Sequence, residues 1–542
     1  MTPTPMATAA ARPSGPARAA TSSFTGTATL LRLALRRDRV RLSVWLAILT
    51  LMMVYAPNAI RLAYPGEEQR LARVNLLKTP AGMMLGGPMF GVNETDLGVM
   101  MANELTLTLT IATSILAILT VIRHTRAEEE NGTAELVLSS VVGRYARTTA
   151  ALILVGGLNA VLALTMTLAM ASTGFGIADT AAMCLGITGV AMVFGAVAAV
   201  TAQLWRQART ASGAAMAVLA VAALVRGAGD VIDNSGSVLS WFSPIAWAQQ
   251  MRPFVDLRWW PFGLLVILAV ALMAVAAVLE RRRQYDAGTI ASAGEKPDAP
   301  TITGPLRLHA TLQRGQTIGW AAGLFVAGLV FGSMTKALLD AAKTNDLIAR
   351  LLSTTGNDGI YTTMTQFLAA AASAYVASAV LRVYADEQNG LGEPVLAGAV
   401  SRWRWLLGAV CCAVAGAAIL MFCAGLGNGL GAGLTLGQPA TIVHLTLAAL
   451  AYLPALAVVA SIAALAVALR APWIAWLAVT FVITTLYLGA LLRLPRWLLD
   501  LSPVGQTTVP REFPALALLV MLIAATVLAA VAGWIYRNRD AV

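Results

Sequence analysis

Apolar runs of roughly 17 to 25 residues recur along the chain, each long enough to cross about 30 Å of hydrocarbon as a helix. The runs do not alternate apolar and polar residues as barrel strands do, so helices are predicted. The run at 440–469 is long and contains Pro454, so we expect it to be kinked or tilted. We predict twelve spans: 42–59, 99–122, 148–172, 180–204, 211–229, 260–279, 315–335, 363–383, 404–427, 440–469, 471–492 and 514–535.

Composition supports an all-α integral membrane protein. Hydrophobic residues make up 58% of the 542 positions and charged residues only 12%, about half the share of a soluble domain. The net charge is +11, but the arginines cluster beside the apolar runs, which is typical of cytoplasmic loops and does not indicate nucleic-acid binding. The four cysteines and three histidines have no metal-ligand spacing, so we expect no metal site.

The arginines also predict the orientation in the membrane. Arginine groups precede the first span, lie between the fourth and fifth, and follow the sixth and the last. With twelve spans, this pattern places both termini in the cytoplasm of a multi-pass plasma-membrane protein. The segment 59–98 would then carry its basic residues outside, which long loops tolerate.

A polar, Gly- and Pro-containing linker divides the chain into two halves. We predict a disordered cytoplasmic tail at 1–28 and a first six-span half at 29–283. A cytoplasmic linker at 284–312 and a second six-span half at 313–542 follow.

The two halves repeat each other. Residues 127–144 read AEEENGTAELVLSSVVGR and residues 385–402 read ADEQNGLGEPVLAGAVSR, with nine of eighteen positions identical at an offset of 258. Chance would give roughly one identity. Each copy follows the second span of its half, so the chain is predicted to be a parallel tandem duplication, which is a transporter architecture.

The repeated segment is too short and polar to span the membrane. Asn-Gly at 131–132 and 389–390 predicts a turn, and Pro394 fits only the first turn of a short helix that would begin beside it. Glu135 and Glu393 would then lie near the positive end of that helix. Because anionic lipid would repel the leading Glu128, Glu129 and Glu130, docking into a groove on a protein is favoured over a membrane-surface helix.

No segment of the sequence can bind ATP as a P-loop does, because none of the four lysines follows a glycine. We therefore predict that the chain is not an enzyme. The alternative function is a proton-coupled twelve-helix drug transporter, but most spans lack the carboxylates or histidines that proton coupling uses. A membrane glycosyltransferase is a third possibility, for which Asp340, Asp346 and Asp358 are too dispersed.

The pattern R-x-E-E-E-x-G-T-x-E-L-x-L-S-x-x-V-x-R, here Arg126 to Arg144 with Thr133, Leu136, Ser139 and Val142, resembles the first intracellular loop of ABC-2-type export permeases. Its duplicated form resembles the actinobacterial tetronasin/polyketide antibiotic exporter family. The resemblance implies coupling helices that dock on two copies of a separate ABC ATPase, which would supply ATP and Mg²⁺, and export of hydrophobic or amphipathic compounds. The implied coupling residues are Glu128, Glu129, Glu130, Gly132, Glu135, Leu138, Arg144, Glu387, Gly390, Glu393, Leu396 and Arg402. Because the second copy has Asp386, Gln388 and Pro394 where the first has Glu128, Glu130 and Leu136, we expect two unequal docking sites.

Polar residues within the spans are candidates for the substrate pathway. Glu104 and Arg226 are equally compatible with interfacial positions, and Asn159 with a hydrogen bond to a neighbouring helix. The candidates are Asn103, Glu104, Asn159, Arg226 and Gln366.

Overall fold

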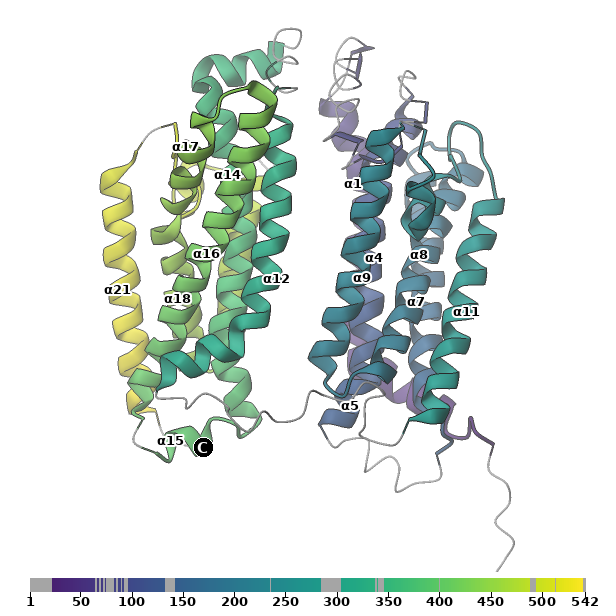
Figure 1. The fold of residues 1–542 in the computed structure, drawn as a ribbon, viewed down its shortest axis with the longest axis horizontal. Helices are drawn as coiled ribbons and strands as arrows, with labels where there is room; N and C mark the ends of the chain where they lie inside the picture. Colours follow the sequence, from purple (N-terminus) through teal and green to yellow (C-terminus); the bar gives the residue numbers. More distant parts are fainter. Residues whose placement is uncertain are drawn as a thin grey trace, which may run out of the picture. The chain divides into compact units, whose positions relative to one another are not determined.

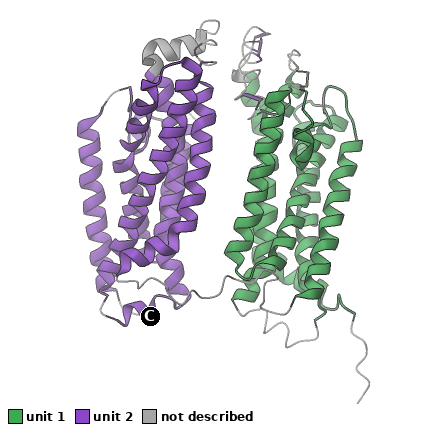
Figure 2. Cartoon of the chain, in the orientation of Figure 1, with its two compact units in different colours: residues 1–65, 85–294 green, residues 66–84, 295–542 purple. Residues whose placement is uncertain are grey.

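The computed structural model is built of helices, and no strand occurs among the residues that it describes. These are residues 22–539 apart from 64–65, 68–69, 72–73, 75–81, 84–85, 89, 92–95, 132–141, 234, 284–303, 337–338, 340–345, 399, 488–493 and 512. The chain divides into two compact units, residues 1–65 with 85–294 and residues 66–84 with 295–542 (Figure 2).

The first unit packs four of its long helices around α8, and the fifth, α1, packs against α7 and α4 (Figure 1). The helix α8 (Ile177–Leu204) is apolar on all sides and contacts α4, α7, α9 and α11, as expected for a helix surrounded by protein. The other long helices are α1 (Thr27–Ala63), α4 (Leu97–His124), α7 (Ala146–Ala171), α9 (Ala208–Ile232) and α11 (Trp260–Arg282). The short helices are α5 (Arg126–Glu130), η1 (Ser240–Phe242) and α10 (Pro244–Gln249).

The second unit is centred on α14, α16 and α18, whose small and apolar residues form one buried core. Its long helices are α12 (Pro305–Ser333), α14 (Asp346–Gln388), α16 (Arg402–Leu436), α18 (Leu453–Ala468) and α21 (Ala515–Asn538). The shorter helices are α15 (Glu393–Leu396), α17 (Ala440–Leu450), α19 (Trp473–Tyr487) and α20 (Arg496–Leu499).

The helices confirm the predicted class of all-α integral membrane protein. Among the described residues, eleven helices or helix pairs are long and apolar enough to cross a membrane, and each matches a predicted span. The predicted span at 471–492 falls on α19, a shorter apolar helix, and its last residues lie outside the described part. The expected irregularity near Pro454 is also present, because α17 ends at Leu450 and α18 begins at Leu453 with proline in its first turn.

The helices α12 and α16 pack with their backbones in contact. A Cβ atom added to Gly427 would overlap the Phe325 carbonyl oxygen, and one added to Gly332 would overlap the Asn428 carbonyl oxygen. Only glycine allows such an approach. Gly328 and Gly332 of α12 are four residues apart, as are Gly427 and Gly431 of α16, so each pair lies on one face of its helix. The glycine-rich run at 425–433 is the feature of the sequence that signals this contact.

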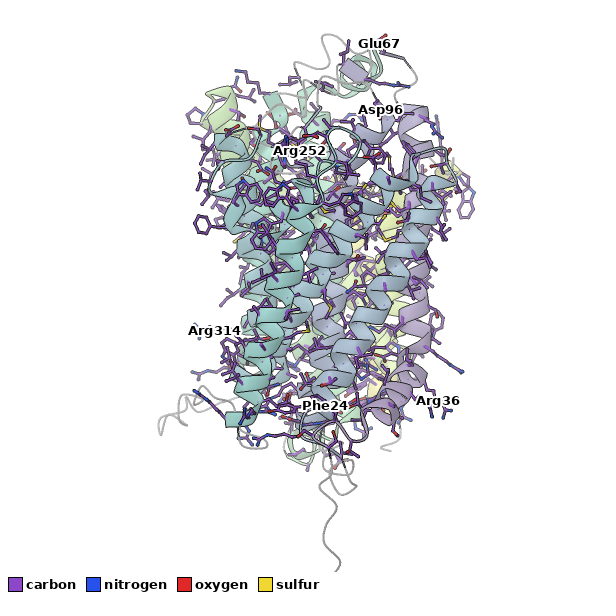
Figure 3. The ribbon with its side chains drawn as sticks, turned by 90° about the vertical axis from the view of Figure 1, so that its right-hand side faces the viewer. Phe24, Arg36, Glu67, Asp96, Arg252 and Arg314 are labelled. Atoms are coloured by element: carbon purple, nitrogen blue, oxygen red, sulfur yellow. The ribbon has the colours of Figure 1, made fainter. Side chains whose placement is uncertain are left out.

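The connections of the first unit lie at two opposite ends. Phe24 and Arg36 lie at one end, and Asp96 and Arg252 lie at the other (Figure 3). We call the first of these the basic end, because arginines of α1, α4, α7 and α11 gather there. The short helix α5 lies at the basic end, which is where the repeated loop begins (Figure 1).

Candidate functional site

The site around the first repeated loop is built by α5, a five-residue helix that follows α4. Its three consecutive glutamates bind three different parts of the first unit. Glu129 is buried, whereas Glu130 is exposed and Glu128 is half-buried. The central carboxylate therefore has a different role from its two neighbours.

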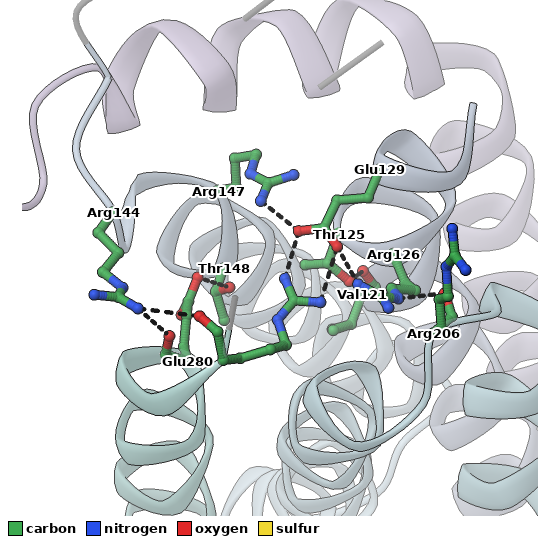
Figure 4. A network of polar contacts seen from close by, with 10 residues as sticks. Val121, Thr125, Arg126, Glu129, Arg144, Arg147, Thr148, Arg206 and Glu280 are labelled. Atoms are coloured by element: carbon green, nitrogen blue, oxygen red, sulfur yellow. Dashed lines mark hydrogen bonds and ion pairs between the residues drawn. The ribbon is translucent and has the colours of Figure 1, made fainter. Parts of the chain in front are cut away.

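Glu129 lies within a cluster of three arginines (Figure 4). Arg283 donates two parallel bonds to it, from Nη1 to Oε2 at 2.9 Å and from Nη2 to Oε1 at 2.5 Å. Arg147 donates to Oε1 at 2.5 Å, and Arg126 donates to Oε2. The Glu129 side chain is only 3% exposed. Three guanidinium groups thus satisfy a buried charge that would be costly if it were unpaired.

Arg144, at the far end of the repeated loop, reaches the carboxyl end of α11 (Figure 4). Its Nη2 donates to the carbonyl oxygens of Glu280 at 3.0 Å, Arg281 at 2.7 Å and Arg283 at 3.2 Å. The last carbonyls of a helix have no partner within the helix and carry partial negative charge, so a guanidinium group is well placed there. The beginning and the end of the repeated loop therefore both contact one helix terminus.

The outer two glutamates tie α5 to other helices. Glu128 lies 3.4 Å from Arg37 of α1, and its Oε1 lies 3.3 Å from Nδ1 of His124. Glu130 accepts a bond of 3.0 Å from the backbone N–H of Ala208, the first residue of α9. A carboxylate at that position satisfies one of the free N–H groups and complements the helix dipole.

Asp38 of α1 completes the basic end. Its carboxylate is 1% exposed and lies 2.8 Å from Nε2 of His124 and 3.0 Å from Nη2 of Arg123. The end of α4 is thus bound to α1 directly as well as through Glu128.

The second repeated loop begins with the turn that the sequence predicted. Gly390 has φ +70°, and the N–H groups of Gly390 and Leu391 donate to the carbonyls of Glu387 and Asp386. This is the Schellman arrangement that ends a helix at a glycine. The predicted short helix also begins beside Pro394, as α15. Glu393 and Pro394 are exposed, whereas Leu396 packs against the core of the second unit.

Glu387, the counterpart of Glu129, makes the counterpart contact. Its Oε2 accepts a bond of 2.6 Å from Nη2 of Arg539, which follows α21, and its Oε1 accepts one from the Tyr536 hydroxyl. Arg402, the counterpart of Arg144, donates to the Arg539 carbonyl oxygen. Side-chain exposures are 16% for Glu387 and 19% for Arg539, so this cluster is less buried than the first.

Three predicted coupling residues of the first loop, Gly132, Glu135 and Leu138, lie outside the described residues. The docking role predicted for them stays a prediction. For Glu129 and Glu387 the structure gives partners that the sequence did not, because both carboxylates bind arginines of their own units. The sequence alone does not identify their partners, because an arginine beside a span is typical of any cytoplasmic loop. These partners are Arg126, Arg147, Arg283 and Arg539.

Two of the substrate-pathway candidates lie near one small cavity of about 20 Å³ in the first unit. Asn103 lines it with Gln249 and Arg252, and the Arg252 guanidinium carbon lies 4.1 Å from the centre of the Phe90 ring. Arg226 lies close to this cavity. Gly87 is in near contact with both Arg226 Nη1 and the side-chain amide of the lining residue Gln249, so that a Cβ atom on Gly87 would overlap both. The cavity holds about one water molecule, so it is no drug-sized chamber.

Arg226 is bound within its own helix. It is 1% exposed and lies 3.2 Å from Asp230, whose other oxygen accepts a bond of 2.7 Å from the Ser240 hydroxyl. Outside the spans, burial lowers the pKa of Arg252, with a further contribution from the neighbouring Arg258. The Phe90 ring face partly offsets the cost of that charge.

The remaining candidates are dispersed. Gln366 donates to the carbonyls of Gly505 at 3.3 Å and Thr507 at 3.1 Å, which indicates that it holds the loop before α21 in place. Asn159 is buried on α7, and its Nδ2 has no partner among the described atoms. Glu104 is half-buried on α4. No group of three or more potential metal ligands occurs among the described residues.

Comparison with known proteins gives two matches. A family model described as the C-terminal domain of the multidrug efflux system permease Rv1217c matches residues 302–537. The multidrug efflux system permease protein Rv1217c of Mycobacterium tuberculosis (strain ATCC 25618 / H37Rv) is 35% identical over 543 aligned residues, which cover 96% of each chain. The similarity therefore extends over both halves.

Proposed function

The chain belongs to the family of the multidrug efflux permease Rv1217c, and from this premise we propose that it is the membrane permease of an ATP-driven (ABC) exporter. Its substrates are hydrophobic or amphipathic compounds, antibiotics and other drugs among them. The proposal rests above all on the 35% identity to a multidrug efflux permease over 96% of both chains.

The repeated loop supports the ABC assignment. It occurs once in each half, as two copies of a separate ATPase subunit would require, and the sequence contains no P-loop of its own. In the second copy, Leu391, Glu393 and Pro394 are exposed next to the helix-ending turn. An apolar and an acidic side chain beside a rigid turn fit a groove on a partner protein. In this proposal the basic end of the first unit and both termini are cytoplasmic.

Transport into inverted membrane vesicles tests this function. Vesicles that contain the full chain and its co-purifying ATPase should accumulate a cationic amphipathic dye when ATP is added, and vanadate should stop the uptake. A protonophore should leave the uptake unchanged. Uptake that is driven by a proton gradient without ATP would instead identify the proton-coupled transporter. The purified chain alone should have no ATPase activity, because it has no P-loop.

A further inference from the structure

Each half attaches both ends of its repeated loop to the carboxyl end of its own last helix. In the first half, Glu129 at the start of the loop binds the Arg283 side chain, and Arg144 at its end binds the Arg283 carbonyl. In the second half, Glu387 binds the Arg539 side chain, and Arg402 binds the Arg539 carbonyl. We name each set of three residues an end clamp.

The two end clamps occupy corresponding places in the duplication. Glu129 and Glu387 differ by 258 positions, as do Arg144 and Arg402, and the terminal arginines differ by 539 − 283 = 256. The surroundings have diverged, since Arg147 corresponds to Trp405 and Glu280 to Tyr536 at these offsets. The two halves thus share the contact between the loop ends and the terminal arginine although the neighbouring residues differ. This indicates that the contact has a role in both halves.

The geometry of the clamp constrains how the loop can move. One arginine is held at its guanidinium group by the start of the loop and at its carbonyl by the end of the loop. A displacement of either loop end therefore acts on the same residue. While these bonds hold, that displacement is passed to the end of α11 in the first half and to the end of α21 in the second.

We infer that the end clamps carry movement of the repeated loops to α11 and α21, so that Arg283 and Arg539 are positioning residues for transport. The inference rests on the proposed function, in which an ATPase moves these loops. It assigns to Glu129 and Glu387 a role inside each half, distinct from contact with the ATPase.

The second end clamp is the better place for a test. Glu129 is surrounded by three arginines, so its removal also disturbs folding, whereas Glu387 has one arginine and is partly exposed. Arg537 provides a matched control, because it is an exposed arginine on the last turn of α21. The variants are Arg539→Glu, Glu387→Arg, the double charge swap and Arg537→Glu.

Each variant is purified as the full complex with its ATPase, and four quantities are measured: membrane level, bound ATPase, ATP hydrolysis and dye transport. We expect both single variants to keep the ATPase bound and hydrolysing while transport per ATP falls about tenfold, within the usual range of coupling between sites. The charge swap should recover most of the transport per ATP, and Arg537→Glu should resemble the unmodified protein. Arg539→Lys, which keeps the charge, should fall between the single variants and the unmodified complex.

Normal transport per ATP in the single variants would overturn the clamp, as would a well-expressed charge swap that transports no better than they do. Loss of transport in strict proportion to membrane level would also overturn it, since that result describes a purely structural contact. An unmodified complex that shows no ATP-driven transport would overturn the proposed function. The two failures are distinguishable, because this one is measured on the unmodified complex and failure of the clamp is measured on the variants.

Discussion

Replacement of Glu129 by glutamine tests the buried cluster at the basic end most directly. Glutamine keeps the shape of the side chain, but it removes the charge and turns one acceptor oxygen into an N–H₂ donor. That donor would face arginine side chains that are only 1%, 11% and 7% exposed. Breaking a buried ion pair from one side costs about 3–5 kcal/mol. This is a large part of the about 5–15 kcal/mol that stabilises a typical protein.

The chain provides its own reporter for this measurement. Cys184 is fully buried in the core of the first unit, whereas Cys411, Cys412 and Cys423 are at least partly exposed in the second. With those three changed to serine, a thiol-reactive dye reports the unfolding of the first unit as Cys184 becomes accessible on heating. We expect the midpoint for Glu129→Gln to fall by roughly 6 °C or more.

Glu128→Gln is the matched control. It removes the same charge one residue earlier, where Glu128 is 20% exposed, its arginine partner Arg37 is 48% exposed and its second contact is the His124 ring. An ion pair as exposed as that with Arg37 contributes about 0–1 kcal/mol. Equal midpoints for the two variants would refute the stabilising role assigned to the Glu129 cluster. A greater loss for Glu128→Gln would have the same consequence.

Three further predictions concern the second unit. Gly390→Ala should lower the stability by about 1–2 kcal/mol in thermal unfolding, because φ +70° is strained for alanine; an unchanged midpoint would contradict the turn geometry. Gly427→Ala should lower the midpoint clearly, because its Cβ would overlap the Phe325 carbonyl oxygen, whereas Gly319→Ala, with nothing within 4 Å, should be silent. Glu393→Lys should weaken co-purification of the ATPase without changing the membrane level; full binding would argue against docking at α15.

Much of the helical fold was accessible from the sequence, because a helix that faces lipid must be apolar along its whole length. The existence and order of the spans, the interruption near Pro454 and the turn at Gly390 all follow from local composition. The helix boundaries do not, because several helices extend into polar sequence beyond the apolar runs. The helix α1 begins at Thr27 and not at 42, α12 begins at Pro305 within the predicted linker 284–312, and α16 ends at Leu436 and not at 427. The contact between α12 and α16 was also encoded locally, in the glycine-rich run at 425–433, but the run alone does not name its partner helix.

The burial and the partners of the acidic residues could not be predicted from the sequence in the same way. The sequence places three glutamates side by side, and nothing in that pattern separates the buried Glu129 from the exposed Glu130. Its partners Arg147 and Arg283 lie 18 and 154 residues further along the chain. Contacts between residues so far apart in the sequence depend on how the helices pack. The spacing of residues within one segment does not predict that packing.

The position of Arg283 in the chain bears on how the first half is made. A ribosome synthesises Glu129 early and adds Arg283 only after 154 more residues, when the last helix of the half has emerged. Until then the carboxylate has at most Arg126 and Arg147, and the carbonyls at the end of α11 do not yet exist. Closure of the cluster is therefore a late event in biogenesis. A nascent chain that stalls before α11 therefore lacks one of the three arginines around Glu129 and the helix end that Arg144 binds.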